Sequence, residues 1–145
     1  MKIFFRLGPL GYFTLGSAKG NQGMHDQILA MKWVQTNIEA FGGNPKNITL
    51  MGESAGAMSS LLHLISPLSQ GLFQKIIAFS GSPSTPFLHN DRKPDCYGRA
   101  FARKVLGNKI SGKNSISDEE LLEMLKEVPA NIIGENMTLF KDWDT

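Results

Sequence analysis

The chain has 145 residues, of which 41% are hydrophobic and 19% are charged, and this composition is typical of one globular domain. Its formal net charge is +2, with lysine and arginine spread along the sequence, so no basic stripe for nucleic acid is present. No apolar run reaches the roughly 18 residues that a membrane span requires.

The first residues, "MKIFFRLGPLG", contain an apolar stretch that Arg6 interrupts. This stretch is shorter than the apolar core of a secretory signal, which needs about 7–15 residues. The single cysteine, Cys96, cannot form an intramolecular disulfide. Both features favour a cytoplasmic protein, and a secreted protein is the alternative if a signal precedes Met1.

In chain order, residues 1–23 combine a short apolar piece with five glycines and Pro9, which predicts irregular chain with turns. From Met24 onward, apolar residues recur at helical spacing and predict one long helix. Gly42 and Gly43, followed by Pro45, mark its end. The apolar face of this helix comprises Met24, Ile28, Met31, Val34, Ile38 and Phe41.

Two short apolar runs, Ile48–Met51 and Lys75–Phe79, predict buried strands, and the first is expected to be buried on both faces. Between them, Ala55–Leu64 is rich in alanine, methionine and leucine and predicts a buried helix. The two prolines of "SPSTPF" (82–87) exclude regular structure there. Strands alternating with helices indicate an α/β architecture with a mainly parallel sheet.

The C-terminal third predicts two further helices. The first covers Asp95–Leu106, with Tyr97, Phe101 and Val105 on one side. Ser117, followed three residues later by Glu120, forms the pattern of a capping box at the start of the second. The inner face of that helix comprises Leu121, Leu122, Leu125 and Val128, and Pro129 ends it.

The segment Gly52-Glu53-Ser54-Ala55-Gly56 lies where the strand pattern stops and the helix pattern begins. A sharp strand–turn–helix exposes a serine hydroxyl, holds that residue at positive φ and needs small neighbours, which Gly52 and Gly56 supply. The onset of a helix also aims backbone N–H groups at the site, so the Ala55 N–H is a candidate oxyanion donor. A nucleophilic Ser54 is favoured over a coincidental turn.

Three stretches carry a family resemblance: "RLGPLGYFTLG", "NQGMHDQILAMKWVQTNIEAFGGNPKNITLMGESAGA" and "GLFQKIIAFSGSP". Together they resemble the carboxylesterase/cholinesterase (type-B carboxylesterase) family, and the insect-type esterases in particular. The resemblance covers Arg6 to about Pro129. It implies an α/β-hydrolase fold that cleaves carboxylic esters through a Ser-Glu-His triad.

The resemblance also implies roles for single residues. Ser54 is the nucleophile, Ala55 supplies one oxyanion N–H, and Glu53 is the acidic neighbour of the catalytic histidine. Ser80 matches a serine just outside the triad. Phe87 stands where the family often carries a bulky aromatic of the acyl pocket, commonly tryptophan, so the acyl preference stays open.

Each of these assignments has a structural alternative. Glu53 could be a solvated turn residue, Ser80 ordinary turn chemistry and Phe87 loop packing. Arg6 and Asp26 match a buried structural ion pair of the family, and Asp26 is also suited to the first turn of its helix, where an acid favours the dipole.

In α/β-hydrolases the triad runs serine, acid, histidine along the chain. The first acid after Ser54 is Asp91, and both later histidines, His63 and His89, precede it. A glycine-rich oxyanion segment is absent too. We therefore expect residues 1–145 to be part of a single carboxylesterase domain whose oxyanion and acid/histidine segments lie elsewhere. The chain alone is expected to be inactive and to fold poorly.

The expected partner is a small-molecule ester, with no nucleic acid and no membrane span, and the oligomeric state is open. No metal or cofactor is implied, because the three histidines have no metal-ligand spacing and are better explained as solvated or core residues. The rival from another class is a non-catalytic cholinesterase-like binding or adhesion protein. Such proteins commonly lose the serine, so the intact Ser54 argues against it.

Overall fold

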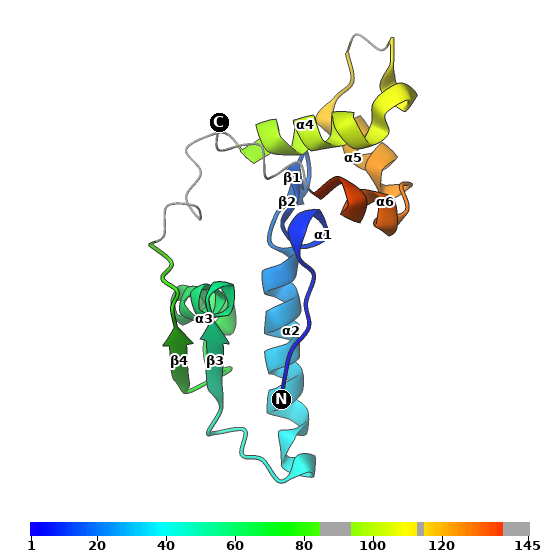
Figure 1. Cartoon of the computed structure of the whole chain (residues 1–145). Coiled ribbons are helices and arrows are strands. Elements are labelled where there is room, and N and C mark those ends of the chain that lie inside the picture. The colour runs from blue at the N-terminus through cyan, green and yellow to red at the C-terminus, as the bar shows by residue number, and fades with distance from the viewer. Residues whose placement is uncertain (85–93, 113–114, 138–145) are drawn as a thin grey trace. The chain divides into compact units, whose positions relative to one another are not determined.

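The computed structural model describes residues 1–84, 94–112 and 115–137. The chain forms two compact units, the first made of Met1–Phe4 and Met24–Asn90 and the second of Phe5–Gly23 and Asp91–Thr145. Figure 1 labels the elements of both.

The first unit holds the long helix, the strand pair and the helix between the strands. Its elements are α2 (Gln22–Asn37, in this unit from Met24), the 3₁₀ helix η1 (Ile38–Phe41), β3 (Thr49–Glu53), α3 (Ala55–Ile65), the 3₁₀ helix η2 (Pro67–Ser69) and β4 (Lys75–Phe79).

β3 and β4 pair in parallel, with Thr49 opposite Lys75 and Glu53 opposite Phe79. Both predicted strands and the helix between them are confirmed, with the first strand two residues later at its carboxyl end than the apolar run suggested. The described residues thus contain a β–α–β unit, which agrees with the predicted α/β class.

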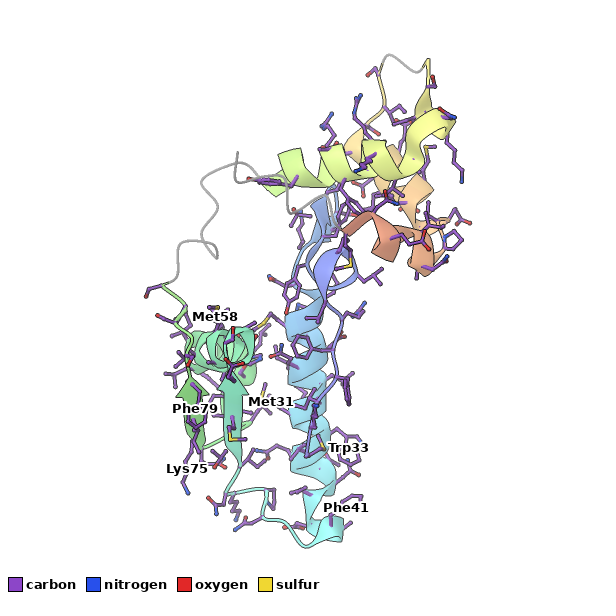
Figure 2. The ribbon with its side chains drawn as sticks, in the orientation of Figure 1. Met31, Trp33, Phe41, Met58, Lys75 and Phe79 are labelled. Atoms are coloured by element: carbon purple, nitrogen blue, oxygen red, sulfur yellow. The ribbon has the colours of Figure 1, made fainter. Side chains whose placement is uncertain are left out.

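Among the described residues of the first unit, the strand pair is covered on one face. Paired residues of parallel strands point to the same side, and α3 packs on the side of Leu50 and Gly52. On the other side, Met51, Ile77 and Phe79 are 72%, 45% and 53% exposed. Figure 2 shows Phe79 on β4. The prediction that Ile48–Met51 is buried on both faces is therefore wrong for the described residues, because one helix covers one face. The prediction that Lys75–Phe79 is a buried strand is wrong for the same reason.

Helix α2 presents Ile28 and Met31 to the interior of the first unit. Its predicted end is confirmed: Gly42 has a φ of 76° and its N–H donates to the Glu39 carbonyl at 3.0 Å. The prediction of this apolar face is wrong at its last residue, because Phe41 is 72% exposed. The tighter 3₁₀ geometry of η1 turns that residue away from the α-helical stripe, and Phe41 instead contacts Trp33, with ring centroids 6.0 Å apart (Figure 2).

The second unit shows structure where irregular chain was expected. Its elements are α1 (Gly8–Tyr12), the antiparallel strands β1 (Thr14–Leu15) and β2 (Ala18–Lys19), α4 (Pro94–Leu106), the 3₁₀ helix η4 (Gly107–Ile110), α5 (Asp118–Lys126) and α6 (Ala130–Glu135). Pro9 lies in the first turn of α1, where a missing N–H costs nothing. Gly16, at φ 55°, makes the turn between β1 and β2.

The core of the second unit is apolar and confirms both C-terminal helix predictions. The Ser117 capping box is present, with the Glu120 N–H donating to Ser117 Oγ at 3.2 Å. A short helix after Pro129, α6, was not predicted. The buried core comprises Leu15, Ala102, Leu106, Ile116, Leu121, Leu122 and Leu125. Across the described residues, none of the helices is both long and apolar enough to cross a membrane.

Candidate active site

Ser54 occupies a strained turn between a strand and a helix. β3 ends at Glu53 and α3 begins at Ala55, and Ser54 itself has φ 51° and ψ −117°. Its side chain makes no capping bond to α3, and the residue is exposed. Non-glycine residues adopt such angles only when the surrounding structure enforces them, and such strain concentrates at functional sites. The predicted strand–turn–helix context is thus confirmed.

Two glycines allow the close approach that this turn requires. A Cβ on Gly52 would lie closer than 3.0 Å to the backbone of Gly56 and Ala57. A Cβ on Gly81 would lie equally close to the Ser54 carbonyl and the Ala57 Cβ. A Cβ on Gly56, by contrast, would meet no atom within 4 Å among the described residues outside its own helix. Gly52 therefore packs against the backbone of Gly56 and Ala57, and Gly81, which was not among the predicted residues, packs against Ser54.

Ser80 lies at the same edge of the strand pair as Ser54. Because Glu53 is opposite Phe79, the next residues along the two strands are Ser54 and Ser80, and the Ser54 N–H donates to the Phe79 carbonyl at 2.9 Å. Ser80 has φ 52°, and these two serines are the non-glycine residues at positive φ within the described part of the chain. The structure thus brings two strained serines together where both parallel strands end.

The first turn of α3 supplies donors beside Ser54. Its opening N–H groups, beginning with Ala55, have no partner within the helix and carry the positive end of its dipole. The Met58 N–H donates to the Ser54 carbonyl at 3.1 Å and closes the first turn. Glu53, the last residue of β3, is exposed next to the serine. This arrangement can present a hydroxyl and stabilise negative charge that develops on a bound carbonyl oxygen.

The remaining predicted residues are Phe87, Arg6 and Asp26. Phe87 lies outside the described residues. Arg6 belongs to the second unit and Asp26 to the first, and each has an interaction partner. The pairing of Arg6 with Asp26 therefore stays a prediction.

His63 was expected to be a solvated or core histidine, and it is a core histidine, 3% exposed. Its Nδ1 lies 2.7 Å from the Ser69 hydroxyl and its Nε2 lies 2.9 Å from the Gln27 Oε1. Burial lowers the pKa of His63 because the charged imidazolium loses hydration. One feature of the sequence points to this cluster, because Gln27 is a polar residue within the apolar stripe of α2.

The lowered pKa of His63 makes folding sensitive to acid. Above the unfolded-state pKa of about 6.5, His63 is neutral in both states and has no effect. As the pH falls below that value, the unfolded chain takes up a proton that the folded chain resists, so stability declines. We expect a melting temperature that falls between pH 7.5 and 5.0, and a smaller fall in His63→Gln. His25→Gln, at an exposed position, is the control. If the melting temperature of His25→Gln also falls less with pH, and by as much as in His63→Gln, the assignment to His63 is wrong.

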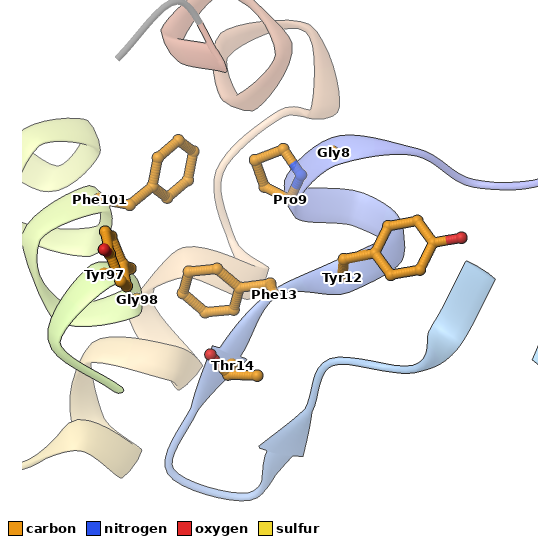
Figure 3. A pocket seen from close by; sticks show the side chains of 8 residues that line it. All are labelled: Gly8, Pro9, Tyr12, Phe13, Thr14, Tyr97, Gly98 and Phe101. Atoms are coloured by element: carbon orange, nitrogen blue, oxygen red, sulfur yellow. The ribbon is translucent and has the colours of Figure 1, made fainter. Parts of the chain in front are cut away.

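The described cavities do not involve the Ser54 turn. A cavity of about 190 Å³ in the second unit is lined by aromatic side chains of α1, α4 and the chain after α1, including Tyr12, Phe13, Tyr97 and Phe101 (Figure 3). A larger one, about 550 Å³, has Arg6 and Lys126 in its lining and also lies in the second unit. Within the described ranges, no cluster of three metal-ligating side chains occurs.

Comparison with known proteins gives a family and several relatives that this chain resembles. The sequence pattern of the family described as "Carboxylesterase family" matches residues 1–144. Esterase E4 of Myzus persicae is 39% identical over 145 residues, which cover 99% of this chain and 25% of that protein. Pyrethroid hydrolase Ces2e of Rattus norvegicus is 42% identical over 127 residues (86% and 21%), and Cholinesterase 2 of Branchiostoma lanceolatum is 41% identical over 135 residues (91% and 39%). The chain thus spans about a quarter of the length of the first of these relatives.

Proposed function

Because the chain belongs to the carboxylesterase family, we propose that it carries the nucleophile of a serine carboxylic ester hydrolase. The observation that supports this most directly is Ser54, an exposed serine at φ 51° between a parallel strand and a helix. The cost of that conformation is explained if the turn serves to present the hydroxyl to a substrate.

In the proposed reaction the Ser54 Oγ attacks the ester carbonyl carbon while a histidine takes its proton. The Ala55 N–H donates to the carbonyl oxygen as it becomes an oxyanion. Collapse of the tetrahedral intermediate releases the alcohol, which receives the proton from the histidine, and leaves an acyl group on Ser54. Water then attacks the acyl-enzyme by the same route, releases the carboxylic acid and restores the serine. This chemistry requires no metal or organic cofactor.

The histidine and its acidic partner are proposed to come from outside residues 1–145. No histidine follows the first acid after Ser54 in this sequence, and His63 already uses both ring nitrogens in buried hydrogen bonds. A serine without a general base is a weak nucleophile, so the 145-residue chain alone is proposed to be inactive.

Roles for Glu53, Ser80 and Phe87 are part of the proposal. Glu53, exposed beside Ser54, is proposed to stabilise the histidine once that residue is protonated. Ser80, next to Ser54 at the strand edge, is proposed to support the triad through a hydrogen bond. Phe87 is proposed as a wall of the acyl pocket. The substrate class is a small carboxylic ester, and the relatives' names, esterase, pyrethroid hydrolase and cholinesterase, support ester chemistry without selecting one substrate.

A fluorophosphonate probe tests the proposal because it reacts with serines that a general base activates. Transcript sequencing across both ends of the coding region first defines the natural polypeptide that carries this sequence, referred to below as the natural protein. We expect the probe to modify Ser54 in the natural protein, as located by peptide mass spectrometry, and to label the isolated 145-residue chain far more slowly. A folded natural protein that the probe leaves unmodified at Ser54 would refute the proposal.

The second candidate is a non-catalytic binding or adhesion protein of the same family. An intact Ser54 at positive φ argues against it, since a binding protein gains nothing from a strained, exposed serine. The probe separates the two, because a binding protein would not be labelled.

A further inference from the structure

Helix α3 is anchored at its carboxyl-terminal end by three buried polar side chains, Gln27 of α2, His63 of α3 and Ser69 of η2. Their exposed fractions are 7%, 3% and 1%, and all three belong to the first unit. Buried polar side chains are costly unless they are hydrogen-bonded. Here the hydrogen bonds join three separate elements through one imidazole.

The direction of these hydrogen bonds follows from the atoms involved. The Gln27 Oε1 can only accept a hydrogen bond, so the His63 Nε2 must be protonated and donate to it. The two atoms lie 2.9 Å apart. In the neutral imidazole the Nδ1 is then an acceptor, and it takes the Ser69 hydroxyl proton over 2.7 Å. Both ring nitrogens are therefore used by partners on opposite sides of the ring. This fixes the orientation of the ring in a way that apolar packing, which is non-directional, does not.

The other end of α3 is the Ser54 turn. His63 lies nine positions after Ser54, which is about 13.5 Å along a helix at about 1.5 Å per residue. The turn is connected to α3 and β4 through the Met58 N–H, which donates to the Ser54 carbonyl, and the Ser54 N–H, which donates to Phe79. Because a helix of this length moves as a rod, a tilt at His63 is transmitted to Ser54 and to the N–H groups beside it.

A second contact holds the same parts of the first unit together. The Gln35 Nε2, two turns along α2 from Gln27, donates to the Gly71 carbonyl at 2.9 Å. Gly71 follows η2 in the segment that joins α3 to β4. Helix α2 is thus joined to this connecting segment at two places, directly from Gln35 to Gly71 and through His63 to Ser69. Of these two, the contact through His63 also involves α3.

We infer that His63, held by Gln27 and Ser69, is a positioning residue that sets the placement of α3 and so of Ser54 and the Ala55 N–H. This inference rests on the proposed function for its effect on rate, but its effect on the turn is independent of catalysis. Catalysis is sensitive to such placement, since shifts of about 1 Å can lower rates about 100-fold.

The test compares variants of the natural protein that remove one or both hydrogen bonds. His63→Leu removes both, whereas His63→Gln keeps an amide near the position of Nε2 and can retain the bond to Gln27. Ser69→Ala removes only the bond to Nδ1 and is the milder variant if His63→Leu does not fold. His25→Leu, at an exposed position of α2, is the matched control for loss of a histidine.

Two readouts are measured on each variant: amide hydrogen exchange at Ser54 and Met58, and the rate of fluorophosphonate labelling of Ser54. In His63→Leu, we expect the protection factors of both amides to fall about tenfold for each hydrogen bond removed. The protection factors of the amides in the β3–β4 ladder are expected to stay nearly unchanged. Labelling is expected to slow by about 10–100-fold, with partial rescue in His63→Gln and no change in His25→Leu. Ser69→Ala is expected to show the smaller loss at the same two amides.

Two results would overturn the inference. One is unchanged protection and labelling in His63→Leu and Ser69→Ala. The other is an equal loss of protection at the turn and throughout the β3–β4 ladder, which would show that His63 supports only global stability. If the unsubstituted protein is not labelled at all, the proposed function fails, and the exchange measurement still decides whether His63 positions the turn.

Discussion

Replacement of Ser54 by alanine is expected to lower kcat for a small carboxylic ester by about 10⁴-fold or more in the natural protein, because the acyl-enzyme can no longer form. The residual rate would come from the oxyanion donors and substrate binding alone. The measurement is steady-state hydrolysis of a chromogenic ester, with Ser115→Ala as the control, since Ser115 is an exposed serine of the second unit. Near-normal turnover in Ser54→Ala would contradict the nucleophile assignment.

A glycine at position 54 separates the chemical role of the serine from its conformational cost. Ser54→Gly is expected to be as inactive as Ser54→Ala, since it also lacks the hydroxyl. It should nevertheless be more stable than Ser54→Ala by about 1 kcal/mol, because glycine adopts a φ of 51° without a Cβ penalty. Thermal or denaturant unfolding of the two variants measures this difference. Equal stability would mean that the turn carries no strain.

Gly52→Ala is expected to lower the free energy of unfolding by about 3 kcal/mol or more. The new methyl would lie closer than 3.0 Å to the Gly56 carbonyl group and the Ala57 nitrogen. Both are backbone atoms, so the overlap is relieved only by moving α3 away from β3, which costs packing. Loss of esterase activity should accompany the loss of stability, because Ser54 connects these two elements.

Gly56→Ala is the matched control, four residues along the same motif. A Cβ there has nothing within 4 Å among the described residues, and alanine is favoured over glycine within a helix by up to about 1 kcal/mol. We therefore expect Gly56→Ala to be as stable as the natural protein or slightly more so. Similar destabilisation by both substitutions, measured by denaturant unfolding, would show that the contact between Gly52 and α3 is not the cause.

The local pattern predicted the elements that build the turn. Apolar runs bounded by glycine and turn residues were sufficient to locate β3, α3 and β4, and helical periodicity located α2, α4 and α5. These elements follow from contacts within a few residues, which a sequence pattern records directly. The segment before Met24 was misjudged, because its glycines and Pro9 suggest breaks, whereas one proline begins α1 and Gly16 joins β1 to β2.

The residue pattern alone predicted that Ser54 lies on a tight turn between a strand and a helix, and it showed which family the motif resembles. The tertiary structure was needed to show that Gly81 packs against this turn, that Ser80 also has a positive φ, and that His63 is hydrogen-bonded to Gln27. The difference depends on how far apart the contacting residues lie along the chain. The turn depends on neighbouring residues, whereas Gly81 meets Ser54 across paired strands, and Gln27 meets His63 across 36 residues of chain.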